Sequence, residues 1–381
     1  MMRGYGMRWL CGLLVVMSAC GGWTSADGMV EPLRRATFRA VGDIMVHEGQ
    51  LLAHAKKDGE YDFFPAFTLI KDALSAADYT LGNLECTVGK HEGMPYTGYP
   101  AFNAPASLLD ALLDAGVDML TLANNHILDR KEAGVMLTVE EVEKRGFAHV
   151  GANRNMEERK ATCIVDVCGF KVGFLAYTQH TNGMHKYVDQ QMLPFLVNMM
   201  TMEAAEADIA ALKAGGAEVI IASIHWGLEY KRRPEADTRA LAQKLIDAGI
   251  DIILGSHPHN VQPVQYLNST DGTRRGLVMY SMGDFLGTMI SRYADGGLIF
   301  EFTLQETISG GIEIVDLGFL PTYMWRGSLR NKGRIVRVVP IPKYWDKPVK
   351  TMDSEAYQLM KRSLRDTRST LKNSPVELLR E

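Results

Sequence analysis

Short apolar runs alternate with amphipathic helical patterns along most of the chain, and this alternation constrains the fold more than any other feature. It is typical of βαβ units built around a buried sheet. The expected strands are residues 37–41, 79–82, 119–123, 219–224 and 252–255, and the expected helices are residues 64–77, 106–115, 131–144, 201–214 and 235–248.

A second group of strand patterns has no helices between its members. Residues 161–167 and 170–177 form a hairpin pattern about Cys168-Gly169, and residues 261–266, 277–281, 298–304 and 312–317 are predicted to be successive antiparallel strands. The sequence therefore predicts an α/β fold with two packed mixed β-sheets flanked by helices. We expect this domain to span residues 37–325, followed by a C-terminal extension, residues 326–381, with a helix near residues 354–372.

The first twenty residues have the composition of a secretory signal. Arg3 and Arg8 precede an apolar run, residues 9–17, that is too short to span a bilayer, and Ser18-Ala19-Cys20 follows it. This end resembles a bacterial lipobox, in which the cysteine thiol is diacylated and becomes the new N-terminus. We expect export, lipidation of Cys20 and a tether over residues 21–36. The alternative is an ordinary signal peptide with an incidental cysteine.

The composition indicates a folded protein without a nucleic-acid partner. Hydrophobic residues make up 46% of the chain, and 41 basic against 45 acidic residues give a net charge of -4 without blocks of like charge. Besides Cys20, the chain after the signal holds only Cys86, Cys163 and Cys168, too few for a disulfide framework. Cys163 and Cys168 could pair, but buried small hydrophobic residues are the favoured interpretation.

Unusual polar residues follow five of the predicted strands. In open α/β sheets the carboxyl ends of the strands form the crevice in which ligands bind, so we expect the five loops to converge. They contain Gly42-Asp43, Gly82-Asn83-Leu84-Glu85, Ala123-Asn124-Asn125-His126, Ser223-Ile224-His225-Trp226-Gly227 and Gly255-Ser256-His257-Pro258-His259.

The donors in these loops favour divalent metal ions. Carboxylates, an amide oxygen and several imidazoles form a mixed nitrogen and oxygen ligand set that suits Mn, Fe or Zn better than Ca. The donors are too many for one tetrahedral ion and fit two, which together can generate hydroxide and neutralise charge during phosphoryl transfer. Each motif alone has a structural alternative, because Gly-Asp is common in turns and a single strand-end histidine is often a hydrogen-bonded structural residue.

Six motifs occur in a fixed order between about residues 38 and 286. They are Gly42-Asp43-Ile44-Met45, Gly82-Asn83-Leu84-Glu85, Ala123-Asn124-Asn125-His126, His225-Trp226-Gly227-Leu228-Glu229-Tyr230, Gly255-Ser256-His257-Pro258-His259 and Tyr280-Ser281-Met282-Gly283-Asp284-Phe285. As a set they resemble the poly-γ-glutamate capsule synthesis (CapA) family. The resemblance implies the calcineurin-like metallophosphoesterase fold, a β-sandwich flanked by helices.

The resemblance also implies roles for single residues and two divalent metal ions as cofactors. The implied metal ligands are Asp43 and His259 at the first ion, Glu85 between the ions, and Asn125, His225 and His257 at the second. His126 would be the histidine that binds no metal and instead stabilises the transition state or protonates the leaving group.

Departures from the family pattern bear on activity. Met45 stands where phosphoesterases of this superfamily usually carry a histidine, so the first metal site is expected to be weak. His47 could compensate, although a solvent-facing position is favoured for it. Ser256 stands where the family often has His. Asp284 stands where it often has Asn, and is interpreted either as an extra acceptor near the site or as a strand-end cap.

Other polar and aromatic residues are expected near the ligands. Trp226, Glu229 and Tyr230 are predicted to form the wall beside His225, and packing, with Glu229 orienting an imidazole, is favoured over substrate contact. Asn83 and Asn124 are candidates for supporting the ligands or contacting substrate.

One long segment lacks clear periodicity. Residues 179–200, which include Thr181-Asn182-Gly183, His185 and Lys186, are a candidate substrate loop or lid.

Three functions follow from these observations. The leading one is a metal-dependent hydrolase or transferase that acts outside the cytoplasm in making, exporting or anchoring an anionic envelope polymer. The second is a non-catalytic metal-binding scaffold in a capsule synthase and export complex, and the third is a general extracytoplasmic phosphodiesterase. The expected partners are the polymer or a phosphoester substrate, the membrane through the lipid anchor, and capsule synthase or export proteins.

Overall fold

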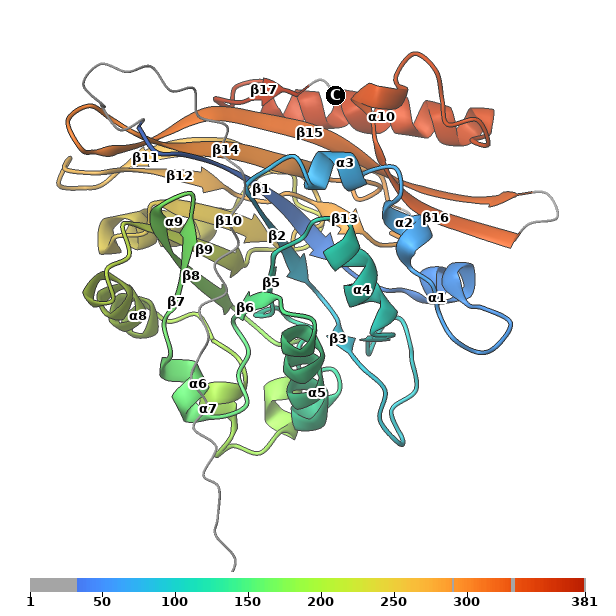
Figure 1. Cartoon of the computed structure of the whole chain (residues 1–381), viewed down its shortest axis with the longest axis horizontal. Coiled ribbons are helices and arrows are strands. Elements are labelled where there is room, and N and C mark those ends of the chain that lie inside the picture. The colour runs from blue at the N-terminus through green and yellow to red at the C-terminus, as the bar shows by residue number, and fades with distance from the viewer. Residues whose placement is uncertain (1–32, 290, 330–332, 380–381) are drawn as a thin grey trace, which may run out of the picture. The chain divides into compact units, whose positions relative to one another are not determined.

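Two β-sheets form the centre of the molecule, and the computed structural model describes residues 33–289, 291–329 and 333–379 (Figure 1). The first sheet has the order β16 (Gly333–Pro340), β15 (Ile312–Leu329), β14 (Leu298–Glu306), β1 (Arg35–Ile44), β2 (Tyr79–Leu84), β5 (Met119–Thr121) and β6 (Ala148–Val150). Off this path, β13 (Asp284–Leu286) pairs with β1, and β17 (Glu377–Leu378) pairs with β15.

The second sheet is built around the predicted hairpin and the later apolar strands. Its order is β11 (Val264–Asn268), β12 (Arg275–Met279), β10 (Ile252–Ser256), β9 (Val219–His225), β8 (Phe170–Thr178) and β7 (Cys163–Val167). A short separate pair joins β3 (Thr87–Val88) and β4 (Asn103–Ala104). The predicted α/β class with mixed sheets is confirmed.

The two sheets pack face to face. Their shared core contains Phe38, Phe300 and Phe302 from the first sheet and Val172 and Ile252 from the second. Phe38 and Phe302 stack with their ring centroids 5.2 Å apart. Burial on both faces explains why these strands are near-continuous apolar runs in the sequence.

Helices cover the outer faces of the sheets (Figure 1). Helices α8 and α9 pack on the second sheet, and α2, α4 and α5 pack on the first. The helices are α1 (Glu48–His54), α2 (Phe64–Phe67), α3 (Lys71–Leu74), α4 (Ser107–Asp114), α5 (Lys131–Lys144), α6 (Met156–Lys160), α7 (Leu193–Leu196), α8 (Met202–Ala214), α9 (Ala236–Ala248) and α10 (Ser354–Leu371), with 3-10 turns η1 (Met184–Tyr187) and η2 (Pro342–Tyr344).

Strand direction places the functional loops together. Strands β1, β2, β5 and β6 are mutually parallel in the first sheet, and β8, β9, β10 and β12 are parallel in the second. The carboxyl ends of each set therefore lie at one edge of the sheet, which is where ligands bind in folds of this class.

Three predictions of local structure need correction. The helix expected over residues 64–77 is split into α2 and α3, because Ile70 N donates to Phe67 O (3.0 Å) in a tight turn. Strands β12 and β14 are not neighbours, since the chain crosses between the sheets through β13. The boundary expected after residue 325 falls inside β15, and Leu33–Glu381 form one compact unit.

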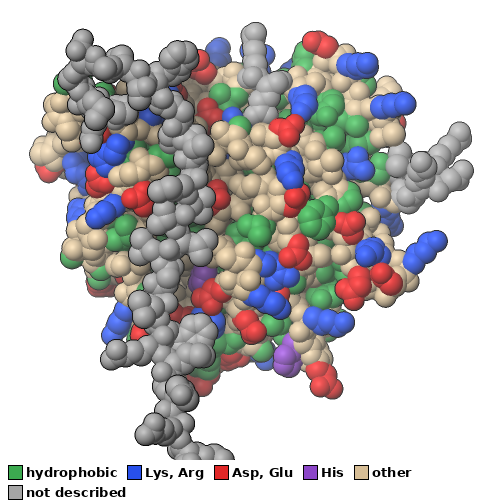
Figure 2. Space-filling model, in the orientation of Figure 1, with side chains coloured by type: hydrophobic (Ala, Val, Ile, Leu, Met, Phe, Trp, Pro, Cys, Tyr) green, Lys and Arg blue, Asp and Glu red, His purple; other side chains and the backbone are tan. Residues whose placement is uncertain are grey.

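The C-terminal segment is thus part of the fold. Figure 1 shows α10 lying along β15, and Tyr323 and Trp325 share a buried cluster with Met360 and Leu364 of that helix. The free thiol of Cys163 lies on β7. On the face seen in Figure 2, basic and acidic side chains are mixed, as the balanced charge of the sequence predicts.

The predicted signal, Cys20 and most of the predicted tether lie outside the described residues. Among the residues that are described, each helix is too short or too polar to cross a membrane.

Candidate metal centre

The structure brings the six predicted ligands together at the carboxyl ends of both sheets. Asp43 lies near the end of β1, Glu85 follows β2, and Asn125 follows β5. From the second sheet, His225 ends β9, and His257 and His259 follow β10. All six side chains are buried.

Direct contacts link these side chains into one cluster. Asn125 Oδ1 lies 3.0 Å from His225 Nε2, and Glu85 Oε1 lies 3.5 Å from the same nitrogen. The ring centroids of His225 and His257 are 4.7 Å apart. His259 Nδ1 lies 3.4 Å from Asp43 Oδ2. These distances are within the reach of donors that share metal ions.

Glu85 belongs to both of the fully buried donor groups. Ligand atoms of Glu85, His225 and His257 all lie within 4.8 Å of one another, as do those of Asp43, Glu85 and His259. A further group, Glu229 with His257 and His259, meets the same limit, and in this group Glu229 is exposed. Two groups that share one carboxylate match the arrangement expected for two neighbouring cations.

The Glu85 carboxylate itself fits a cation. It is completely buried, and neither oxygen has a hydrogen-bond partner in the part of the chain that the structure describes. Burial, followed by the charge of Asp43, raises the pKa of Glu85 well above its usual value. A buried carboxylate without hydrogen bonds is unfavourable unless it is neutralised or binds a metal, so the surrounding donors favour a cation here.

The pKa values of the three histidines in the cluster are shifted in different directions. Burial, followed by repulsion from His257, lowers the pKa of His225 well below its usual value. Burial, followed by the charge of His180, lowers the pKa of His257 to about 3. Burial also opposes charge on His259, but Asp284, Asp43 and Glu85 outweigh it and raise the pKa of His259 well above its usual value.

Several neighbouring side chains position the candidate ligands. Asn83 Nδ2 donates to Asp43 Oδ1 at 2.7 Å, and Ser256 Oγ lies 2.9 Å from His225 Nδ1. Asp284 lies on β13, opposite Asp43 of β1, and its Oδ1 is 2.8 Å from His259 Nδ1. Burial raises the pKa of Asp284 to about 6, although His259 lowers it.

Other predicted residues support the fold around the site. Asn124 Nδ2 donates to Leu84 O at 2.7 Å, and Asn124 Oδ1 accepts from His126 N at 3.1 Å, so this side chain braces the loop. Trp226 is buried, and its Nε1 donates to Tyr280 O at 2.9 Å. Glu229 and Tyr230 are exposed, and the Tyr230 ring centroid is 5.8 Å from that of His259.

The backbone is unusual where the histidines leave β10. His257 and His259 have positive φ angles of 95° and 57°. Left-handed conformations are uncommon for residues other than glycine and cluster at functional sites. A β-carbon at Gly42 would lie 1.8 Å from Gly283 O. The glycine before Asp43 is therefore required by the close approach of the residue that precedes β13.

His126 lies beside the cluster and belongs to none of the three donor groups. Its Nδ1 is 2.8 Å from Asp129 Oδ2, and its ring packs edge-on against Phe102. Helix α5 begins at Lys131 and has Arg130 as its N-cap, so His126 does not cap that helix.

The segment of residues 179–200 contributes contacts that the sequence did not single out. His180 Nε2 lies 3.1 Å from His257 Nε2. Asn182 approaches Asn125 at 3.4 Å and His126 Nε2 at 3.5 Å. His180 closely follows β8, so the strand-end rule that selected the other histidines could have identified it.

The structure corrects the expectation for His47. It is half-buried and packs edge-on against Phe102, with ring centroids 5.0 Å apart. Burial, followed by the charges of His259 and His126, lowers the pKa of His47 to about 4. Phe102 packs on His126 as well, so both histidines contact the same ring. Met45 lies in the main hydrophobic cluster and adds no donor.

The chain is similar to known bacterial proteins in sequence. Residues 37–289 match the family model described as "Bacterial capsule synthesis protein PGA_cap". The capsule biosynthesis protein CapA of Bacillus anthracis is 27% identical over 315 residues, which cover 80% of this chain and 74% of that protein. The PGA biosynthesis protein CapA of Bacillus subtilis (strain 168) is 26% identical over 300 residues, with 77% and 74% covered.

Solved structures show more distant likenesses. The NAD nucleotidase NadN of Haemophilus influenzae has a TM-score of 0.49 and 12% identity, with 91% of this chain but only 64% of NadN covered. The calcineurin-like phosphoesterase YfkN of Bacillus subtilis has a TM-score of 0.43 and 15% identity, with 90% and 100% covered. At these scores the likenesses do not bear on the activity.

Proposed function

Because the chain belongs to the bacterial capsule synthesis protein family PGA_cap, we propose that it is an extracytoplasmic, metal-dependent hydrolase or transferase acting on an anionic capsule polymer of the polyglutamate type. The family match covers residues 37–289, which include all six candidate ligands and His126. The two CapA relatives are named for capsule and PGA biosynthesis. These names support the biological setting, and the reaction is inferred from the site.

The observation that carries the proposal is the position of Glu85. Its buried carboxylate is shared by a group that contains His225 and His257 and by a group that contains Asp43 and His259. Its two oxygens are both without hydrogen bonds among the described residues, which leaves them available to two cations. Mixed carboxylate, amide and imidazole ligands support Mn, Fe or Zn as the ions.

The residues around the ions would orient the substrate and handle protons. Two divalent ions, held by these ligands, would supply a hydroxide nucleophile near neutral pH and neutralise negative charge on the reacting group. We assign His126 to the leaving group, because its Nδ1 lies 2.8 Å from Asp129 Oδ2 and its Nε2 faces Asn182. A protonated Nε2 can donate a proton to a leaving oxygen or nitrogen within hydrogen-bond distance. Asn182 and His180 would border the bound substrate.

Turnover measurements test this proposal. The purified chain, loaded in turn with Mn, Fe and Zn, should cleave or transfer either a generic phosphodiester or oligo-γ-glutamate, and a chelator should abolish the reaction. Turnover of oligo-γ-glutamate would assign the reaction to the amide polymer. Turnover of the phosphodiester alone would favour a general phosphodiesterase. Absence of turnover in a fully metallated chain would contradict the enzymatic proposal.

A non-catalytic metal-binding scaffold is the second candidate, and Met45 favours it. Its side chain lies in the hydrophobic core, so the Asp43 side of the centre has one donor fewer than the superfamily pattern. A chain that binds ions but turns over neither substrate would have this function.

Location is tested separately from chemistry. Cys20→Ser should release the protein from the membrane fraction, because acyl chains would be its anchor. Unchanged fractionation of the variant would contradict lipidation.

A further inference from the structure

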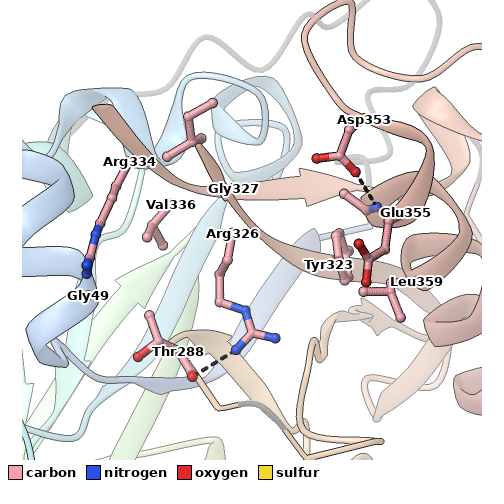
Figure 3. Close-up of a pocket in the computed structure, with 12 residues that line it drawn as sticks. Gly49, Thr288, Tyr323, Arg326, Gly327, Arg334, Val336, Asp353, Glu355 and Leu359 are labelled. Atoms are coloured by element: carbon pink, nitrogen blue, oxygen red, sulfur yellow. Dashed lines mark hydrogen bonds between the residues drawn. The ribbon is translucent and has the colours of Figure 1, made fainter. Parts of the chain in front are cut away.

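A cavity of about 470 Å³ lies between the C-terminal strands and α10 (Figure 3). Its size falls within the ~300–1,000 Å³ typical of ligand sites. Strands β15 and β16 and the first turns of α10 supply most of the lining, and Gly49 and Thr288 supply the rest. Most of the lining therefore lies beyond residue 289, where the family match ends.

The cavity lies close to the metal centre. Thr288 follows Asp284 by four residues, which corresponds to at most ~13 Å of extended chain. Gly49 closes the same wall, because a β-carbon there would lie 3.1 Å from Thr288 Cγ2. His47, two residues before Gly49, packs on Phe102 with ring centroids 5.0 Å apart, and Phe102 packs on His126 at 4.6 Å, so this row of rings leads from the cavity wall toward the centre.

Two arginines supply positive charge on one side of the cavity. Arg326 Nη1 donates to Thr288 O at 2.8 Å, and Figure 3 shows its guanidinium in the middle of the lining with Arg334 on one side. Within residues 33–289, 291–329 and 334–379, neither guanidinium forms an ion pair with a carboxylate. Such groups bind carboxylates through charge-assisted hydrogen bonds.

Hydrogen-bond acceptors occupy the opposite wall. Asp353 and Glu355 lie at the start of α10, across the cavity from Arg334 (Figure 3). Asp353 uses Oδ1 to accept from Ala356 N at 2.8 Å. Its other oxygen and the Glu355 carboxylate can accept from a ligand. The lining thus offers cations on one side and acceptors on the other.

We propose that this cavity is a binding subsite for an acidic polyamide segment, with its carboxylates at Arg326 and Arg334 and its amide N–H groups at Asp353 and Glu355. The inference rests on the proposed function and extends it, since a chain bound here would lead toward the metal centre. A phosphodiester polymer has anionic oxygens but no backbone N–H groups. The two walls together therefore favour a polyamide.

Equilibrium binding of a short oligo-γ-glutamate to the full chain tests the subsite. Arg326→Ala and Arg334→Ala should each weaken binding about fivefold to tenfold, as expected for a partly exposed charge-assisted hydrogen bond. Arg326→Lys should recover part of the affinity, because it keeps the charge but loses the planar fork. Arg368→Ala, which removes an exposed arginine of α10 outside the cavity, is the matched control and should bind like the wild type.

The titration is repeated with inorganic polyphosphate in place of oligo-γ-glutamate. Both titrations are then repeated with protein from which a chelator has removed the metal. The subsite predicts tighter binding of oligo-γ-glutamate than of polyphosphate, and an arginine dependence that survives removal of metal, because no lining residue is a candidate ligand. Equal affinities of wild type and both alanine variants would overturn the inference, as would no binding of oligo-γ-glutamate or preference for polyphosphate. A chain that fails to bind metal but keeps arginine-dependent binding would refute the metal proposal and leave the subsite standing.

Discussion

The two sides of Glu85 offer different donors. On one side, Asn125, His225 and His257 supply an amide oxygen and two imidazoles whose pKa values lie below the usual range. On the other side, His259 Nδ1 lies 2.8 Å from Asp284 Oδ1 and 3.4 Å from Asp43 Oδ2. Met45, two residues after Asp43, lies in the hydrophobic core and adds no donor.

This difference indicates unequal metal affinities. Metal ions bind neutral imidazole, so the His225 side has little to rearrange before an ion binds. On the Asp43 side, the contacts of His259 with Asp43 and Asp284 must be given up before an ion can bind. This side also has one donor fewer than the His225 side. We therefore expect a tightly held ion on the His225 side and a weakly held ion on the Asp43 side.

His225→Ala should have the largest effect. Because His225 contacts both Asn125 and Glu85, its loss should lower affinity for the tight ion by more than ~100-fold, since even outer partners of metal ligands are worth ~10–100-fold. Metal analysis after equilibrium dialysis measures the loss. His91→Ala, an exposed histidine outside the donor groups, is the matched control. Retention of both ions by the His225 variant would contradict the tighter binding expected on the His225 side.

His126→Ala should separate chemistry from metal binding. The variant should keep both ions and lose rate by ~10²–10⁴, as expected for removal of a general acid. Single-turnover rates and metal content are measured on the same sample. If the variant loses an ion as well as its rate, His126 serves the metal centre instead.

Asp284→Asn should act on one side only. It weakens the support of His259, so affinity for the weak ion should fall by ~10–100-fold while the tight ion is unaffected. Calorimetric titration of metal into protein that a chelator has stripped of its ions should resolve two binding phases. Equal weakening of both phases would show that the two sides are not independent.

Trp226→Phe should have the smallest effect on the centre. The indole is buried, stacks on Tyr280 and donates to its carbonyl, so the substitution should cost about 1–3 kcal/mol of stability. Denaturant unfolding measures this cost, and metal content should be unchanged. A loss of metal without a loss of stability would place Trp226 among the functional groups of the site.

Much of the centre could be predicted because its residues follow strands. The position of Asp43, Glu85, Asn125, His225, His257 and His259 at carboxyl ends of strands is visible in the sequence, and parallel strands bring such ends together. His180 also follows a strand, β8, but it lies in the segment of residues 179–200 that lacks clear periodicity, so its position beside His257 was not predicted.

Other features depended on pairing between distant residues. The sequence patterns of β12 and β14 look alike, but only the register shows that they belong to different sheets. The spacing around Met45 gave no means of placing its side chain in the core or His47 beside the site, because both depend on how the loop after β1 packs on Phe102 and β13. The C-terminal strands were similarly hidden by a change to basic, Pro-containing sequence.

The most direct test of the two-ion centre is the metal content of the wild-type chain and of Glu85→Gln at equal free metal. Glutamine keeps the shape of the side chain and removes the charge that both sides share. The wild type should bind about two ions per chain, one tightly and one weakly, and Glu85→Gln should lose the weak ion and hold the other less tightly. A wild type that binds no ions, or a variant that binds them as the wild type does, would contradict the shared role of Glu85.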